Sequence, residues 1–225
     1  MINEKKVSFI VCTNDDNYAS ECERYIRRLY VPEGYEVDVL MVQEAPSMTS
    51  GYNEAMAASD AKYKVYLHQD VMIYEKNLIS RILDIFNDDP SIGLIGTVGN
   101  TKLPESAIHW DQGAVHVGAI YSDIISGVNH RVFEKISGKY QDVTIIDGLL
   151  MATQYDILWR EDLFTGWHFY DLSQSMEFHK KGYRVVVPHM DEPWCFHDND
   201  IHILGDDYYR YRDIFLKEYS VNLSE

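Results

Sequence analysis

Residues 64–71 read Lys-Val-Tyr-Leu-His-Gln-Asp-Val, a mainly apolar run that ends in three polar side chains. A short run of β-branched and aromatic residues closed by polar ones is typical of a buried strand that ends in a loop. Two earlier stretches have the same form: residues 7–11 precede the polar residues 13–17, and residues 37–42 precede Gln-Glu at 43–44. The sequence therefore predicts three buried strands that each end in polar side chains.

Helical stretches and a fourth strand complete the first hundred residues. We predict helices at about 21–30, at 51–59 behind a cap at Thr49 or Ser50, and from 78 to the Asp-Asp-Pro at 88–90, followed by a strand at 92–98. Strands and helices thus alternate along this half of the chain. Such alternation indicates an α/β fold with a Rossmann-like, mostly parallel sheet and helices on both faces.

The second half of the chain has a less regular pattern. Residues 101–140 combine scattered Gly, His, Trp and Asp with short apolar pieces, which predicts long loops and short strands over the sheet edge. Further strands are predicted at 143–146, 149–152, 184–187 and 194–197, and helices at 170–181 and 206–219. Because the sequence shows no internal repeat and no linker-like stretch, we expect one domain over residues 1–225.

Composition restricts the class of protein. The 225 residues include 20 Lys and Arg against 36 Asp and Glu, a net charge of −16, which argues against a nucleic-acid binder. Hydrophobic residues make up 46%, too many for a disordered chain. No apolar run approaches the roughly 20 residues of a membrane span, and residues 7–11 are too short for a signal peptide. We expect a cytoplasmic protein with three free cysteines, and leave open a homodimer and peripheral contact with the inner face of a membrane.

The polar strand ends form the first candidate site, because ligands of open α/β sheets bind at the carboxyl ends of the strands. The sequence has no G-x-G-x-x-G after the first strand and no G-x-x-x-x-G-K-[ST], which argues against dinucleotide-binding Rossmann proteins and P-loop NTPases. A phosphate ligand would then need another positive partner. A divalent cation on a strand-end carboxylate is the simplest one.

Several motifs, in this order, resemble GT-A glycosyltransferases of the family 2 type. In the nucleotide-sugar half, the motifs are Cys-Thr-Asn at 12–14, the pair at 43–44, Tyr-Asn-Glu-Ala at 52–55 and residues 64–71. In the second half, they are residues 164–172, 180–188 and 194–197. The resemblance covers about Val7 to Asp198. Three positions depart from the family pattern. His-Gln-Asp at 68–70 replaces the D-x-D motif, as in a bacterial subgroup of the family. Gln43-Glu44 replaces the acidic pair after the second strand, and Tyr170-Asp171 replaces Glu-Asp.

The resemblance implies one GT-A domain, with a nucleotide-sugar half at 1–100 and an acceptor half with a C-terminal helix at 101–225. It implies metal-dependent, inverting transfer from a nucleoside-diphosphate sugar, with a UDP-sugar as the expected donor. The acceptor would be a glycan or lipid-linked hydroxyl, in bacterial cell-surface polysaccharide biosynthesis.

The resemblance also assigns roles to residues. Asp70 and His197 are the expected ligands of Mn²⁺ or Mg²⁺, with His189 a weaker competitor for the histidine position. Imidazole is a poor ligand for Mg²⁺, so a neighbouring His68 favours Mn²⁺. The residues expected to contact the nucleotide sugar are Thr13, Asn14, Asp16, Glu44, Asn53, His68 and Gln69.

Three residues are candidates for the catalytic base. A sugar hydroxyl is a weak nucleophile, and a carboxylate within hydrogen-bond reach can take its proton. Asp171 is the first candidate, although a helix-opening Asp can also be a simple N-cap. Asp147 is the alternative acid, and His168 is a third candidate.

Two other classes of protein remain open. A non-catalytic nucleotide-sugar-binding or scaffold protein that keeps the fold is compatible with the altered acidic pairs. A metal-dependent nucleotidyltransferase is disfavoured, because residues 13–19 contain neither glycine nor a basic residue. Tryptophans 110, 167 and 194 can stack on sugar rings or pack in the core, and the sequence does not choose between these roles.

Overall fold

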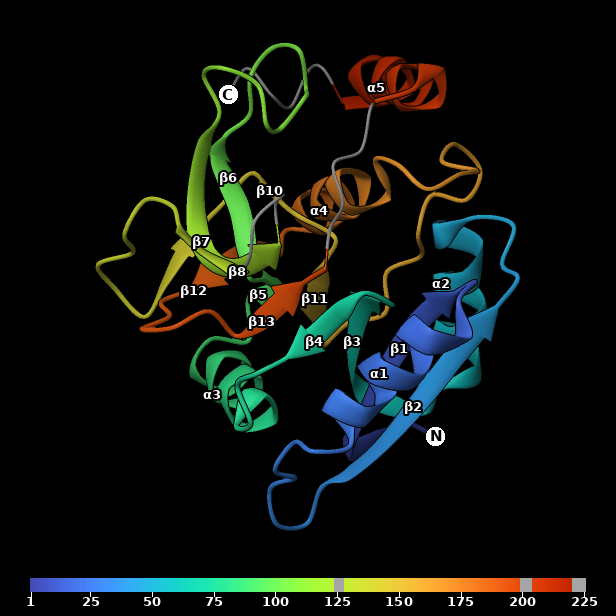
Figure 1. The fold of residues 1–225 in the computed structure, drawn as a ribbon, viewed down its shortest axis with the longest axis vertical. Helices are drawn as coiled ribbons and strands as arrows, with labels where there is room; N and C mark the ends of the chain where they lie inside the picture. Colours follow the sequence, from blue (N-terminus) through green and yellow to red (C-terminus); the bar gives the residue numbers. More distant parts are fainter. Residues whose placement is uncertain (124–127, 199–203, 220–225) are drawn as a thin grey trace.

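The computed structural model describes residues 1–123, 128–198 and 204–219 (Figure 1). Its main sheet has seven strands in the order β2 (Glu36–Gln43), β1 (Asn3–Thr13), β3 (Ala61–His68), β11 (Leu150–Thr153), β5 (Ile92–Gly96), β12 (Arg184–Pro188) and β9 (Tyr140–Asp142). Five of these strands run in one direction, because β11 pairs antiparallel with both β3 and β5, and only β9 and β11 are reversed. The expectation of a mostly parallel α/β sheet is confirmed.

Helices cover both faces of this sheet, as the alternation along β1 requires. Phe9 and Val11 point to one side, where they pack with buried residues of α1 (Asp16–Ile26) and α3 (Leu78–Asp88). Ile10 and Cys12 point to the other side, towards α2 (Met48–Ala58) and α4 (Tyr170–Lys180). Successive side chains of a strand face opposite sides, so a continuous apolar strand needs cover on both.

A second sheet lies against the carboxyl end of the first. Its strands run β10 (Ile145–Ile146), β6 (Val98–Lys102), β7 (Val115–Asp123), β13 (Cys195–His197) and β4 (Val71–Ile73), and β8 (Val128–Val132) pairs with β7. The prediction of one strand at 92–98 is wrong, because the chain leaves the main sheet at Thr97 and enters the second sheet as β6. The prediction of only short strands within 101–140 is also wrong, since β7 has nine residues and three neighbouring strands.

Two helix starts differ from the prediction for a local reason. Helix α1 begins at Asp16, not near 21, because the side chain of Asp15 accepts the amides of Asn17 and Tyr18 and caps the helix. Helix α2 is capped by the hydroxyl of Ser47, which accepts the amide of Ser50. Each cap satisfies amide groups that have no partner inside the helix.

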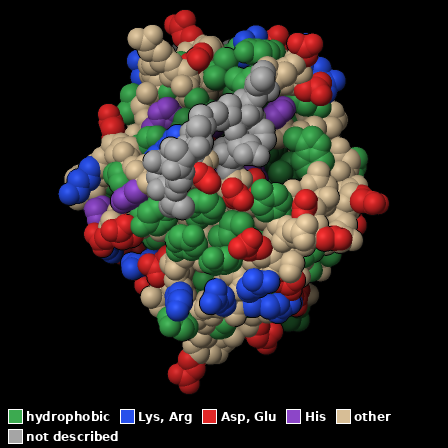
Figure 2. All heavy atoms as spheres, viewed as in Figure 1, with side chains coloured by type: hydrophobic (Ala, Val, Ile, Leu, Met, Phe, Trp, Pro, Cys, Tyr) green, Lys and Arg blue, Asp and Glu red, His purple; other side chains and the backbone are tan. Residues whose placement is uncertain are grey.

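The last helix, α5 (Asp206–Tyr219), packs its aromatic side chains on the start of α4. Among the described helices, none is both long and apolar enough to span a membrane. Cys12, Cys22 and Cys195 are free and buried. Acidic side chains are spread over the face shown in Figure 2, where Lys and Arg lie in a row across the lower part and also at the upper and left edges. The negative charge is therefore distributed over this face.

Gly118 allows a close approach of β7 to the backbone at Thr97, where the chain passes from one sheet to the other. Gly118 of β7 has φ +107°, and a Cβ there would lie 2.1 Å from the carbonyl oxygen of Thr97. We expect Gly118→Ala to lower the free energy of unfolding by about 3 kcal/mol or more, through backbone strain and overpacking together. Gly113 has φ +99° but open space around it, so Gly113→Ala should cost only the strain, about 1 kcal/mol. Urea unfolding of both variants checks this, and equal losses would contradict it.

Candidate metal and acceptor site

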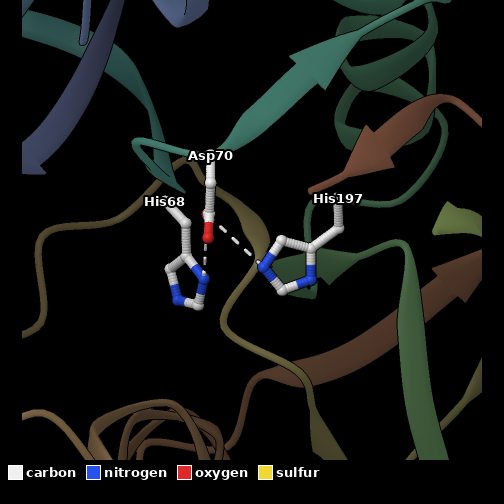
Figure 3. Close-up of side chains that lie close together, drawn as sticks. All are labelled: His68, Asp70 and His197. Atoms are coloured by element: carbon white, nitrogen blue, oxygen red, sulfur yellow. Dashed lines mark ion pairs between the residues drawn. The ribbon is translucent and has the colours of Figure 1, made fainter. Parts of the chain in front are cut away.

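The side chains of His68 and Asp70 meet that of His197, which is distant in the sequence, at the carboxyl end of β3 (Figure 3). His68 is the last residue of β3, and Asp70 immediately precedes β4. Strand β13 pairs antiparallel with β4, with His197 opposite Val71, and the amide of Asp198 donates to the carbonyl of Asp70 at 3.0 Å. The strand pairing therefore brings His197 to Asp70. We call His68, Asp70 and His197 the His-Asp-His group.

The geometry of the His-Asp-His group fits a divalent cation. Oδ1 of Asp70 lies 3.4 Å from Nε2 of His197 and 3.8 Å from Nδ1 of His68, and one ligand atom from each residue lies within 4.8 Å of the others. Oδ1 of Asp70 is buried and makes no hydrogen bond. Because buried carboxylate oxygens nearly always have a partner, an orphaned one facing two imidazole nitrogens indicates a place for a cation.

The protonation of the group also suits metal binding. Burial lowers the pKa of His68, outweighing the attraction of Asp70, so its imidazole is neutral at neutral pH. Burial lowers the pKa of His197 as well. The Asp70 carboxylate raises this pKa by a larger amount, so its net shift is upward. Burial raises the pKa of Asp70, while the two histidines lower it by more. Asp70 and His197 thus lie within ion-pair distance, and the net shift of each pKa favours the charged form of that residue.

Tyr170, the first residue of α4, orients His68. Its hydroxyl forms a short hydrogen bond with Nε2 of His68, which leaves Nδ1 facing Asp70. A Cβ on residue 148 would lie 2.1 Å from this hydroxyl oxygen, which is too close. Only glycine at position 148 therefore leaves room for Tyr170. A partner on the far nitrogen of a ligating histidine sets its tautomer and ring orientation. Sequence reasoning did not find this role, and the only signal was a tyrosine where the family has glutamate.

Asp171 is not the N-cap of α4. The N-cap is Phe169, with φ 62°, and Asp171 is the second residue of the helix. Its Oδ2 accepts the amide of Gly148 at 2.8 Å and its Oδ1 accepts the amide of Leu172 at 2.9 Å. Burial, together with repulsion from Asp147, raises the pKa of Asp171 to about 7. The carboxyl group therefore titrates near neutral pH.

Asp147 lies close enough to Asp171 and to the His-Asp-His group to act on the pKa values of both. Its amide donates to the carbonyl of Val98, and its Oδ1 accepts the amide of Leu149 at 3.1 Å. The charge of Asp147 raises the pKa of Asp171, and it acts in the same direction on His68 and His197. The structure thus brings both candidate acids to the neighbourhood of the His-Asp-His group.

On the predicted nucleotide side, Gln69 organises the loop after β1. Its Oε1 accepts the hydroxyl of Thr13 at 2.7 Å and the amides of Asn14 and Asp15 at 3.0 and 3.1 Å. Its Nε2 donates to the side chain of Asn14 at 2.7 Å. Gln69 thus binds Thr13, Asn14 and Asp15, and Asn14 is exposed whereas Thr13 is buried and Gln69 is partly buried.

The other predicted nucleotide contacts are more scattered. Asp16 is exposed in the first turn of α1, and Glu44 is exposed after β2 with φ 53°. Both amide atoms of Asn53 bind the backbone of Trp159, at 3.0 and 2.9 Å, so this residue joins α2 to the segment before α4. The geometry favours a structural role for Asn53, and its contact with a nucleotide stays a prediction.

Two further histidines lie outside the His-Asp-His group. The ring of His168 packs edge-on against Tyr208 at 5.3 Å. His189 bonds through Nδ1 to the carbonyl of Ile136 at 2.8 Å and lies beside Asp191. Within the described residues, His197 is thus the histidine from the second half of the chain that joins His68 and Asp70.

Comparison with known proteins gives a family and a fold. Residues 8–219 match the sequence model described as "Glycosyltransferase like family". No curated protein matches the chain. TarS from S. aureus has a similar structure, with TM-score 0.60 and 14% identity over 95% of this chain. TarS 1–349 in complex with UDP gives TM-score 0.56 and 13% identity over 95% of this chain.

A third similar structure is the mannosyltransferase PcManGT from Pyrobaculum calidifontis, in complex with GDP-Man and Mn²⁺. It has TM-score 0.59 and 14% identity over 99% of this chain. This chain spans 40% of the TarS chain, 65% of TarS 1–349 and 65% of PcManGT. At these identities the structural likeness establishes the GT-A fold.

The raised pKa of Asp171 gives a stability signature. Between the ordinary carboxyl pKa of about 4 and about 7, the folded state holds a proton that the unfolded state releases, so the free energy of unfolding falls as pH rises. Asn does not titrate, so Asp171→Asn should gain stability relative to the wild type as pH rises across this window. Urea unfolding at pH 5, 6, 7 and 8 measures the difference. A difference independent of pH would refute the raised pKa.

Asp147→Asn is the matched control. Removing the charge of Asp147 should lower the pKa of Asp171, because the repulsion between the two carboxylates is lost. The stability difference caused by Asp171→Asn, measured in the Asp147→Asn background, should then change with pH in a lower pH range than in the wild-type background.

Proposed function

The chain belongs to the glycosyltransferase-like family that it matches over residues 8–219, and we propose that it transfers a sugar from a nucleoside-diphosphate sugar to a glycan or lipid-linked hydroxyl. The family, with a GT-A fold like those of TarS and PcManGT, makes it a glycosyltransferase. Solved neighbours bind UDP, UDP-GlcNAc or GDP-Man, and we propose a UDP-sugar as the donor. Residues 1–100 would bind this donor, and residues 101–225 the acceptor.

The His-Asp-His group carries the proposal. Its ligand atoms lie within 4.8 Å of one another at the carboxyl end of the central strand β3, where α/β sheets bind ligands. Two imidazoles and one carboxylate favour Mn²⁺ over Mg²⁺. When bound, the cation supplies positive charge against the departing diphosphate, a Lewis-acid role. Tyr170 holds His68 in the ring orientation that this site needs.

The loop after β1 supports the donor side of the proposal. Gln69 ties Thr13, Asn14 and Asp15 together directly beside Asp70 in the sequence. Exposed Asn14, Asp16 and Glu44 then offer carbonyl and carboxylate oxygens at the ends of β1 and β2, which suit ribose hydroxyls and base N–H groups. A pre-ordered loop lowers the entropy cost of binding.

We propose Asp171 as the general base, with Asp147 as the alternative. A pKa of about 7 matches a base that works near neutral pH. Each oxygen of Asp171 accepts one backbone amide and keeps a second lone pair, so it can still accept the proton of an acceptor hydroxyl. Direct displacement by that hydroxyl inverts the anomeric centre.

Asp70→Ala should remove metal-dependent donor binding. In the wild type, Mn²⁺ with the correct nucleoside diphosphate at about 100 times its dissociation constant should raise the unfolding free energy by roughly 2.7 kcal/mol. The variant should lose the Mn²⁺-dependent part, because its only carboxylate ligand is gone. Thermal unfolding with UDP, GDP, CDP and ADP measures both. Asp198→Asn, a neighbouring acid outside the His-Asp-His group, should keep the shift.

Two outcomes of this experiment would contradict the proposal. A full Mn²⁺-dependent shift in Asp70→Ala would place the cation elsewhere. No shift with any nucleotide or nucleotide sugar, in wild-type protein shown to be folded, would favour the non-catalytic scaffold.

The base assignment predicts a pH profile. The wild-type kcat/KM for transfer should rise with pH through about 7 and then level off, because Asp171 must lose its proton to act. Asp171→Asn should lower kcat about 10²- to 10⁴-fold and abolish this rise. Asp147→Asn should move the rise to lower pH. If Asp171→Asn keeps nearly full activity while Asp147→Asn loses it, Asp147 is the base. NMR of the product's anomeric proton reports inversion.

A further inference from the structure

Trp110 is half exposed to solvent although its ring is held in place. The indole stacks on the imidazole of His116 with a centroid distance of 4.7 Å and an interplanar angle of 16°, and it lies 4.6 Å from the ring of His109 and 6.1 Å from the ring of Phe133. Trp110 nevertheless remains 49% exposed. The three neighbouring rings therefore hold the indole in place and leave about half of the side chain open to a ligand.

The segment that carries Trp110 is well ordered. The side-chain amide of Asn100 donates to the carbonyl of His109 at 3.1 Å, which fastens the segment to β6. The hydroxyl of Ser106 donates to Asp111 at 2.8 Å, and Ala107 is fully buried. A ring that is already fixed loses little rotamer freedom when a ligand covers it.

This position is on the acceptor side of the proposed active site. Asp147 is bonded to Val98 of β6, and two residues further along, about 7 Å away, Asn100 pairs with His116. The charge of Asp147 acts on the pKa values of His109 and His116 as it does on those of the His-Asp-His group, so it lies within electrostatic reach of both places.

The same segment also packs beside the proposed base. Leu103 and Ala107 belong to one apolar cluster with Phe169 and Leu172, which flank Tyr170 and Asp171 at the start of α4, and with α5 (Figure 1). The donor-side loop after β1 is held instead by Gln69, at the end of β3. The Trp110 segment therefore packs beside α4 and α5, whereas the donor loop is held by the end of β3, so different elements of the fold carry the two segments.

Polar residues follow the half-exposed indole in the chain. Asp111 and Gln112 are both exposed, and the Asp111 carboxylate also accepts the hydroxyl of Ser106. An apolar, electron-rich ring with a carboxylate and an amide on the next two residues suits a pyranose ring, which has a C–H face and a rim of hydroxyl groups. A lipid tail would call for a wider apolar surface without such polar neighbours.

We propose that Trp110 is the platform of an acceptor subsite, which stacks one sugar ring of a glycan while another sugar of the same glycan reacts. This inference rests on the proposed transferase function and deepens it. The acceptor is then a glycan of at least two sugar units, because His116, under the platform, lies six residues along β7 from Ser122, the partner of His197, a distance of about 20 Å. Asp111 and Gln112 bind hydroxyl groups of the stacked ring.

Glycan-array binding of the full chain, with Mn²⁺ and UDP present, tests the subsite. The wild type should bind glycans of two or more sugars, and Trp110→Ala should weaken their binding at least about tenfold through lost stacking and buried area. Trp110→Phe should keep part of the binding, since it keeps a ring. Tyr30 is 58% exposed and lies outside the proposed site, so Tyr30→Ala is a control for loss of an exposed aromatic ring and should bind as the wild type does.

Three results would overturn the proposal: no bound glycan on the array, equal binding by wild type and Trp110→Ala, or an equal loss in Tyr30→Ala. The Mn²⁺- and nucleotide-dependent thermal shift separates this failure from failure of the proposed function. Trp110→Ala should keep that shift. Loss of the shift in a folded Trp110→Ala would mean that the indole stacks on the donor's base, which also overturns the proposal. A wild type without any shift would instead refute the transferase function.

Discussion

The antiparallel pairing of β4 with β13 is the contact on which the proposed site depends. Asp70 and His197 are far apart in the sequence, and neither side chain is placed by its own strand alone. Backbone hydrogen bonds between the two strands, continued by the amide of Asp198 on the carbonyl of Asp70, fix their relative position. Strand ladders are stiff and use obligatory hydrogen-bonding groups, so the site is held by the backbone and not by the side chains that would bind a ligand.

A chain of contacts joins the metal side to the acceptor side. His68 bonds to Tyr170, Tyr170 lies against Gly148, and the amide of Gly148 donates to Asp171. Only Tyr170 and Gly148 therefore lie along the line of contacts between His68, the proposed cation ligand, and the carboxyl group of Asp171. Burial in this small volume, with Asp147 nearby, raises the pKa of Asp171, and burial lowers the pKa of His68; such perturbed groups are common in active sites.

Much of the fold could be predicted from local patterns. The alternation of buried strands and amphipathic helices identified the α/β class, because side-chain periodicity is a property of each segment. The strand ends at Thr13 and His68 were placed at one edge of the sheet because parallel strands end together, and the pairing of Cys12 with His68 confirms this. The break at Thr97 was missed, since a continuous apolar run does not reveal that its two ends enter different sheets.

The sequence by itself determined the family and the fold class, because these follow from residue types and their order along the chain. The convergence of Asp70 and His197, suggested only by resemblance, became a geometric fact through strand pairing. Only the tertiary structure showed that Gln69 binds the loop after β1, that Asn53 binds Trp159, and that Tyr170 orients His68. A polar side chain takes whichever partner the packing of distant segments brings within hydrogen-bond distance, and no local pattern records that choice.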